Sequence, residues 1–231
     1  MIAPPTNVLC RTFFIKAASY GTAFTLEVDG IEYLVTARHL FDTEAAEHEV
    51  SVHVNNGLTK LDILQLDFGR GEADIAVLRV RQRLSPQGMD LEPTVANMTL
   101  GQDVFILGFP DQMYEDVGMH MNGFPCPLVK RGTASNLGMR DPQELLVDVW
   151  SNLGFSGGPV VFSPLDKPKV FRVAGVISGF KLYHEPVKDK DGNDTGMYVE
   201  VNSGFLRAYG IKHALTIIER MAANPPSDTS H

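Results

Sequence analysis

The chain has 231 residues, of which 44% are hydrophobic and 21% charged, so it can build a core of its own. Its formal net charge of −8 argues against nucleic acid and anionic membrane surfaces as partners, because like charges repel. No stretch approaches the roughly 18 consecutive apolar residues that a membrane-spanning helix needs.

Cys10 and Cys126 are the only cysteines, too few for a disulfide framework in a chain of this length. Residues 1–17 lack the charged leader and apolar run of a signal peptide. We therefore expect free thiols and a cytoplasmic location. Cys126 lies between two prolines, without a glycine nest or a helix N-terminus to lower its pKa, which disfavours it as a nucleophile.

Short apolar runs separated by turn residues fill the first part of the chain. The pair Asp29-Gly30 predicts a two-residue hairpin, and residues 50–54 alternate as a half-buried strand does. A short helical turn is expected at residues 37–41. Strands are predicted at residues 8–17, 21–28, 31–35, 50–54, 58–68 and 74–80.

Residues 81–100 are more polar and predict a linker, after which a second group of strands begins. Strands are predicted at residues 104–109, 127–134, 144–150, 159–162, 170–180 and 197–201. The acidic segment 191–194 does not match a calcium-binding loop and is interpreted as a hairpin tip. Only residues 206–223 show helical periodicity, before a proline stop. The pattern indicates an all-β protein, either a sandwich or paired barrels, with one C-terminal helix.

The sequence Gly-Phe-Ser-Gly-Gly-Pro at residues 154–159 has two interpretations. It is typical of a tight turn, because glycine and proline interrupt regular structure. It also suits an acyl-transfer nucleophile at Ser156, because glycines let a carbonyl group approach and can aim successive N–H groups at an oxyanion. A base and an orienting acid elsewhere would decide between the two.

His39 and Asp74 are the candidates for that base and acid. His39 follows a predicted strand, where a sheet can fix its position, and none of the six other histidines lies beside a catalytic pattern. Asp74 directly precedes an apolar run, so its carboxylate lies at the edge of the core and needs a partner. An imidazole N–H is a suitable one. A local turn at a strand start is the alternative interpretation for Asp74.

The motifs at residues 36–39, 74–78 and 154–159, in this order, resemble those of the trypsin-like (chymotrypsin-fold) serine proteases. Segments 174–179 and 196–201 also fit, and the resemblance covers roughly residues 20–220. The lack of disulfides and the sequence Asp-Ile-Ala-Val-Leu at 74–78 are more similar to the bacterial HtrA-type branch. No segment remains for the PDZ domain that HtrA proteases usually carry, so we expect none.

This resemblance implies two six-stranded antiparallel β-barrels, to which the helical periodicity adds a C-terminal α-helix. The first lobe, residues 1–90, would carry His39 and Asp74, and the second, residues 91–205, would carry Ser156. A helix at 206–223 and a disordered tail at 224–231 would follow. The implied activity is that of a serine endopeptidase acting through an acyl-enzyme intermediate on a protein or peptide, with no cofactor and no metal. The sequence does not indicate an oligomeric state.

The resemblance also implies a role for each site residue. Ser156 would be the nucleophile, His39 the general base and then acid, and Asp74 the orienting group. The N–H groups of Gly154 and Ser156 would form the oxyanion hole. Ser178, Gly179 and Phe180 would form the edge strand that pairs with an extended peptide. Trp150 would lie at or near the base of the P1 pocket, with Gly179, Phe180 and Gly196 around its walls, and this uncharged pocket would favour a small-to-medium apolar P1 side chain.

Phe155 departs from the family pattern, because digestive members have an aspartate there that pairs with a new N-terminus after activation. We therefore expect an oxyanion loop held by packing. Residues 154–158 also satisfy the nucleophile elbow of α/β-hydrolases, but Gly157, Gly158 and Pro159 are poor starters for the helix that this fold requires. A catalytically silent, protease-like module that binds peptides or partner proteins is the remaining alternative.

Overall fold

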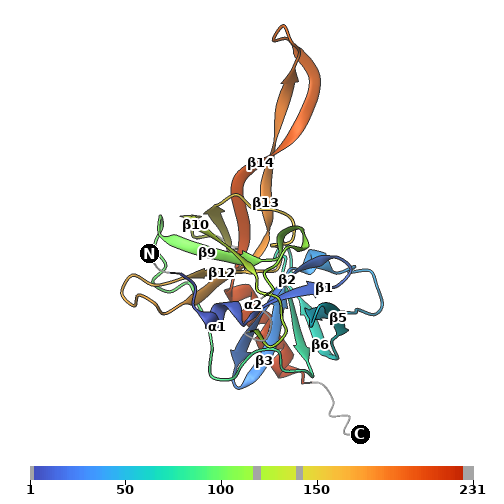
Figure 1. The fold of residues 1–231 in the computed structure, drawn as a ribbon, viewed down its shortest axis with the longest axis vertical. Helices are drawn as coiled ribbons and strands as arrows, with labels where there is room; N and C mark the ends of the chain where they lie inside the picture. The colour runs from blue at the N-terminus through green and yellow to red at the C-terminus, as the bar shows by residue number, and fades with distance from the viewer. Residues whose placement is uncertain (1–2, 117–120, 139–142, 226–231) are drawn as a thin grey trace.

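The computed structural model describes residues 3–116, 121–138 and 143–225 and is mostly β-structure. Two sheets, each of seven strands and antiparallel except for one short strand, pack side by side (Figure 1), and one helix lies near the C-terminus of the chain. The predicted all-β class with two lobes and a C-terminal helix is confirmed. None of the helices in the described part of the chain has the length and apolar character needed to cross a membrane.

The first sheet has the strand order β5-β4-β1-β2-β3-β7-β6. Its strands are β1 (Thr12–Lys16), β2 (Tyr20–Val28), β3 (Ile31–Thr36), β4 (Ser51–Val54), β5 (Gly57–Lys60), β6 (Ile63–Phe68) and β7 (Ala76–Val80). Asp29 and Gly30 both have positive φ and form the predicted hairpin. The predicted strand 8–17 is wrong at its start, since α1 (Thr6–Leu9) begins there, after Pro5. The predicted strand 58–68 is two strands, so this lobe has seven strands and not six.

The second sheet closes into a ring. Its strands are β8 (Glu92–Pro93), β9 (Asp103–Gly108), β10 (Leu128–Asn136), β11 (Glu144–Asp148), β12 (Pro159–Phe162), β13 (Arg172–Lys188) and β14 (Asp194–Gly210). The order is β12-β9-β10-β11-β14-β13-β8, and β12 also pairs with β13. Six strands therefore form a closed barrel, as predicted, and the short β8 adds to β13 in parallel.

Strands β13 and β14 form a hairpin that projects far out of the second barrel (Figure 1). Each strand has 17 residues, longer than the predicted strands 170–180 and 197–201. The turn lies where predicted: Asp189 Oδ1 accepts the N–H groups of Asp191 and Asn193, both at 2.9 Å. Sequence pattern missed the outer half of the hairpin because side chains on both of its faces are exposed there.

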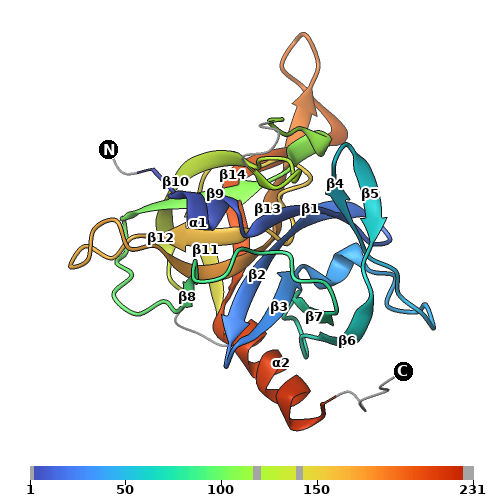
Figure 2. The same ribbon diagram turned by 60° about the horizontal axis from the view of Figure 1, so that its bottom comes forward.

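Helix α2 (Lys212–Ala223) begins six residues later than predicted, because residues 205–209 belong to β14 and pair with β11. Its buried side chains Ala214, Ile217, Ile218 and Met221 join a core cluster that contains residues of both sheets. Figure 2 shows α2 crossing beneath β3, β6 and β7. The two lobes therefore share one continuous core. Of the tail predicted at 224–231, residues 226–231 lie outside the described residues.

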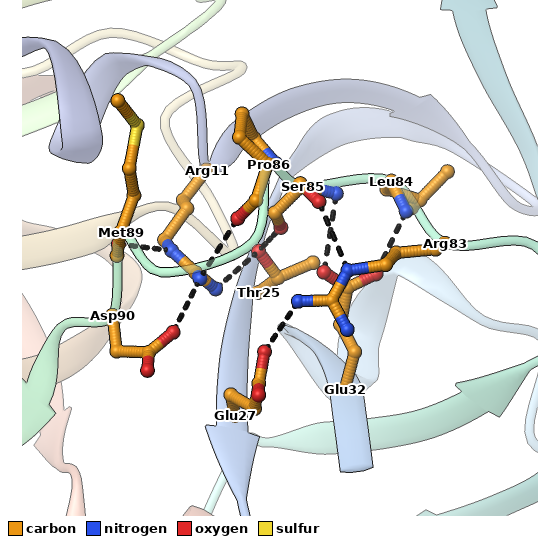
Figure 3. Close-up of polar contacts among 10 residues, drawn as sticks. All are labelled: Arg11, Thr25, Glu27, Glu32, Arg83, Leu84, Ser85, Pro86, Met89 and Asp90. Carbon is orange, nitrogen blue, oxygen red and sulfur yellow. Dashed lines mark hydrogen bonds and ion pairs between the residues drawn. The ribbon is translucent and has the colours of Figure 1, made fainter. Parts of the chain in front are cut away.

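The linker between the lobes is held by a buried arginine (Figure 3). Arg11 has no exposed surface. Its guanidinium donates to the carbonyls of Met89 and Pro86, and to Asp90 at 2.7 Å. Burial lowers the pKa of Arg11, and the neighbouring carboxylate of Asp90 opposes that shift. Thr25 on β2 is bonded to both Arg11 and Ser85, so these contacts fix the start of the linker against the first lobe.

Candidate active site

The sheet register brings His39 and Asp74 together. Thr36 at the end of β3 pairs with Ala76 at the start of β7, so the residues just beyond both ends are neighbours. His39 lies in the short 3₁₀ turn η1 (Arg38–Leu40), as the helical turn predicted there suggested. Its Nδ1 lies 2.6 Å from Asp74 Oδ2, and its backbone N–H donates to Asp74 Oδ1 at 2.8 Å.

The carboxylate of Asp74 is buried and ionised. Burial raises its pKa, but the hydrogen bonds and charge of His39 and the bond from Ser178 outweigh this and lower the pKa overall. An ionised carboxylate can only accept hydrogen bonds, so Nδ1 of His39 carries the proton. In the neutral imidazole this leaves the lone pair on Nε2. The His39 side chain is 46% exposed, so Nε2 is accessible for proton transfer.

Ser156 lies in the loop between β11 and β12, next to the first lobe. Its carbonyl accepts the N–H of Thr22 at 2.9 Å, and the N–H of Gly157 donates to the carbonyl of Ile177 at 2.7 Å. Gly157 has φ +84°, and an added Cβ would lie 2.1 Å from the carbonyl oxygen of Thr22. Only glycine allows this approach between the lobes.

Ser178 connects the nucleophile candidate to the buried acid. Its hydroxyl donates to Asp74 Oδ2 at 2.6 Å, and its carbonyl accepts the hydroxyl of Ser156 at 3.2 Å. Within the described part of the chain, Ser156 forms no hydrogen bond with His39. The structure thus brings four predicted residues, His39, Asp74, Ser156 and Ser178, into one connected network, with Ser156 turned toward Ser178.

Two hydrogen bonds orient the peptide groups on either side of Gly154. The carbonyl of Leu153 accepts the N–H of Asp111 at 3.0 Å, and the carbonyl of Gly154 accepts the hydroxyl of Thr22 at 2.7 Å. Gly154 has φ +101°, and an added Cβ would lie 2.3 Å from the carbonyl of Phe109. Among the described residues, the N–H groups of Gly154 and Ser156 have no acceptor. Both remain available to a ligand, which is the requirement for an oxyanion hole.

Phe155 is fully buried in the core of the second barrel. The Nζ of Lys130 lies 5.2 Å from its ring centroid and donates to Trp150 O and Asn152 Oδ1, both at 2.8 Å. Burial lowers the pKa of Lys130, and Asp111 opposes this shift. The loop before Ser156 is therefore fixed by packing and by one lysine. Sequence reasoning missed Lys130, which lies on a strand remote from the serine motif.

Arg38 was also missed as a supporting residue. Its guanidinium donates to the carbonyls of Gly69 and Gly71, at 3.0 and 3.2 Å. These carbonyls belong to the loop that leads to Asp74, so Arg38 ties that loop to the turn carrying His39. Its position directly before His39 was the only signal that the sequence offered for this role.

The residues predicted to determine specificity do not all lie in one pocket. Gly179 and Phe180 continue β13 directly from Ser178, opposite Arg207 and Leu206. The Trp150 side chain is 60% exposed, so it does not lie at the base of a closed pocket. Gly196 is far out on the hairpin, between Asp194 and Tyr198, with open space around it. Gly204 lies closer to the barrel on β14 than Gly196 does, and its carbonyl accepts the N–H of Val149 at 3.0 Å.

The structure argues against the other chemical interpretations of this region. Pro159–Phe162, which follows the serine motif, is strand β12 and not the helix of a nucleophile elbow. Cys10 and Cys126 are free, and burial raises the pKa of each thiol. Within the described ranges, no group of three or more His, Cys, Asp or Glu side chains is arranged to hold a metal ion.

Comparison with known proteins agrees with this geometry. The model of the trypsin-like peptidase domain family matches residues 21–163, which include His39, Asp74 and Ser156. No curated protein matches the sequence.

Solved structures with the same fold include a variant of the HtrA-type protease AlgW with a tripeptide. It is 18% identical with a TM-score of 0.60, over 95% of this chain and 62% of that one. The chain thus spans less than two thirds of the AlgW chain. An inactive form of the Rv3671c protease is 17% identical with a TM-score of 0.56, over 93% of this chain and 90% of that one.

Proposed function

Since the chain belongs to the trypsin-like peptidase family, we propose that it is a serine endopeptidase that uses Ser156, His39 and Asp74. The observation that carries the proposal is the network around Asp74. His39 Nδ1 lies 2.6 Å from this carboxylate, and Ser178 connects the same carboxylate to Ser156. A purely structural ion pair between His39 and Asp74 would need neither an exposed imidazole nor a nearby serine flanked by two backbone N–H groups, those of Gly154 and Ser156, that have no acceptor among the described residues.

In the first half of the reaction, the hydroxyl of Ser156 turns from the Ser178 carbonyl toward His39 Nε2. Its oxygen attacks the scissile carbonyl carbon while its proton passes to Nε2. The negative charge on the former carbonyl oxygen is stabilised by the N–H groups of Gly154 and Ser156. Asp74 remains ionised and stabilises the imidazolium.

In the second half, the carbon–nitrogen bond breaks and Nε2 returns the proton to the leaving amine. The acyl group stays bound to the Ser156 oxygen. Water then attacks this ester, giving a proton to Nε2, which passes it back to the Ser156 oxygen as the acid product leaves. No oxidant, metal or cofactor enters these steps.

For specificity, we propose a small or medium apolar P1 side chain. Gly179 and Phe180, which follow Ser178 on β13, carry no charge that would compensate a buried ionic side chain. A cleavage profile on a peptide library checks this: enrichment of Ala, Val or Leu before the cleaved bond is expected. Preference for Arg, Lys, Asp or Glu there would contradict it.

The proposed activity is tested by turnover of an unfolded protein substrate and a library of short peptides. Ser156→Ala should lower kcat by about 10⁴-fold or more, because the nucleophile is lost. Ser135→Ala is a matched control, since Ser135 is an exposed serine on β10. Equal activity of Ser156→Ala and the wild type would reject the assignment. Peptide binding without any cleavage would favour the silent binding module.

A further inference from the structure

The open edge of β13 starts at the proposed nucleophile and continues far beyond it. Strand β12 covers β13 as far as Val176, and Ile177 is bonded to Gly157 and Gly158. From Ser178 onward, no described strand pairs with this edge, while β14 pairs with the opposite edge up to Lys188. The carbonyl of Ser178 faces outward, because it accepts the hydroxyl of Ser156.

The hydrogen-bonding direction of each β13 residue can be followed along the hairpin. Ile177 is bonded to Gly157 and Gly158, but a bulge between Ile177 and Gly179 reverses the alternation, so the carbonyl of Ser178 also faces outward. Beyond this bulge the odd-numbered residues face β14, as the carbonyl of Val187 does when it accepts the hydroxyl of Thr195. Even-numbered residues, including Phe180, Leu182 and His184, therefore direct their N–H and C=O groups away from it. Pro186 follows the same alternation and has no N–H to offer. The free edge thus presents backbone N–H and C=O groups from Ser178 to His184, and the missing N–H of Pro186 interrupts this row.

The family resemblance already implies pairing of an extended peptide with Ser178, Gly179 and Phe180. We propose that in this protein the added strand continues along the hairpin to His184, over roughly eight residues in all, so that the enzyme favours long, extended polypeptide. The inference rests on the proposed function, since it extends the binding site of the same nucleophile. An exposed strand edge is a template for pairing with another chain, and here it leads directly into the reacting position. A hairpin with no role in binding would not need a free strand edge that starts beside the nucleophile.

The direction of the added strand follows from the sheet. Antiparallel pairing is the more stable arrangement, and β13 leads away from Ser156 in its N-to-C direction. A substrate strand antiparallel to β13 therefore reaches Ser156 with its C-terminal end. The segment on the N-terminal side of the scissile bond lies along the hairpin, and its length should control the rate of cleavage.

Peptides with one fixed cleavage sequence test the proposal, when lengthened from about two to about ten residues on the N-terminal side. For the wild type, kcat/KM should keep rising beyond four residues and level off near roughly eight, where Pro186 ends the edge. Lengthening on the C-terminal side should give no comparable gain. A rate that stops rising at about four residues would overturn the proposal.

A matched pair of proline variants separates edge pairing from hairpin stability. His184 and Glu200 are opposite one another, and their side chains form an ion pair of 3.5 Å. His184→Pro removes an outward N–H from the β13 edge, whereas Glu200→Pro removes one from the far edge of β14. Both changes delete the same ion pair. We expect His184→Pro to lower kcat/KM for the long peptides by about three- to tenfold, and Glu200→Pro to leave it at the wild-type value.

Equal losses in the two variants would overturn the proposal, since the effect would then come from the hairpin as a whole. Binding of the same peptides to Ser156→Ala, measured by fluorescence anisotropy, keeps this test separate from catalysis. Cleavage without length dependence supports the proposed function but rejects the inference. Length-dependent affinity without cleavage by the wild type rejects the proposed function and supports the extended edge. Affinity independent of length rejects the inference in either case.

Discussion

Thr22 holds the candidate oxyanion loop from the opposite lobe, and its hydroxyl is the most informative group to remove. The side chain is fully buried. Its Oγ1 donates to the carbonyl of Gly154 at 2.7 Å and accepts the N–H of Phe109 at 3.2 Å. Thr22→Val keeps nearly the same volume but leaves both of these backbone groups without a partner.

The size of the effect follows from these two bonds. Each buried backbone group left without a partner costs about 1–3 kcal/mol, so the free energy of unfolding should fall by roughly 2–6 kcal/mol. With its carbonyl released, the Gly154 peptide can rotate and carry the adjacent loop with it. Complete loss of one oxyanion donor lowers kcat by about 10²–10³-fold, so partial misorientation should cost about tenfold to a hundredfold. KM should change little, because the donors act mainly on the transition state.

Thr25→Val is the matched control. Thr25 is on the same strand and equally buried, and its hydroxyl is bonded to Ser85 and Arg11, away from the serine loop. Urea unfolding should show a loss of stability for both variants, whereas steady-state peptide cleavage should show a fall in kcat for Thr22→Val alone. If both variants lose stability and neither loses kcat, Thr22 does not position the oxyanion loop.

Three further predictions concern the elements around the site. Phe155→Ala should lower the free energy of unfolding by about 3–5 kcal/mol, because it leaves a cavity in the second barrel; an unchanged Tm would contradict packing as the support of this loop. Asp74 has a lowered pKa in the folded state, so its ionised form stabilises the fold above the unfolded value of about 3.9, and this contribution is lost as pH falls through the folded value. The stability difference between wild type and Asp74→Asn should therefore shrink below about pH 4 in urea titrations, and a difference independent of pH would refute the linkage. Arg11→Ala should lower the free energy of unfolding by about 2–4 kcal/mol, because it leaves a cavity and unpaired linker carbonyls. Asp90→Asn should lower it by less than about 1 kcal/mol, because the Asp90 side chain is 56% exposed. The reverse order would show that the ion pair matters more than the bonds to the carbonyls.

Sequence reasoning predicted the features of the fold that depend on local chemistry. Asp29-Gly30 adopts positive φ and forms the hairpin, and the strand alternation at residues 50–54 corresponds to β4. It failed where long-range pairing overrides the local pattern. Residues 206–210 have a helical spacing of apolar side chains, yet pairing with β11 and β13 makes them a strand.

The candidate site shows the same division. The motifs around His39, Asp74 and Ser156 identify residue types and order, and the register of β3 with β7 gives the contact between the first two. The supports Thr22, Lys130 and Arg38 act through backbone carbonyls that the fold brings close, and residue type alone does not indicate such contacts. Gly196 shows the limit of motif matching, because the long hairpin moves it away from the residues it was grouped with.

Covalent labelling of Ser156 by a fluorophosphonate tests the central claim most directly, because the reagent reports an activated serine without any assumption about the substrate. Intact-mass measurement of the folded protein should show one adduct, peptide mapping should locate it on Ser156, and His39→Ala should react far more slowly. Absence of an adduct on the folded wild-type protein, or an adduct on another serine that persists in Ser156→Ala, would contradict the account.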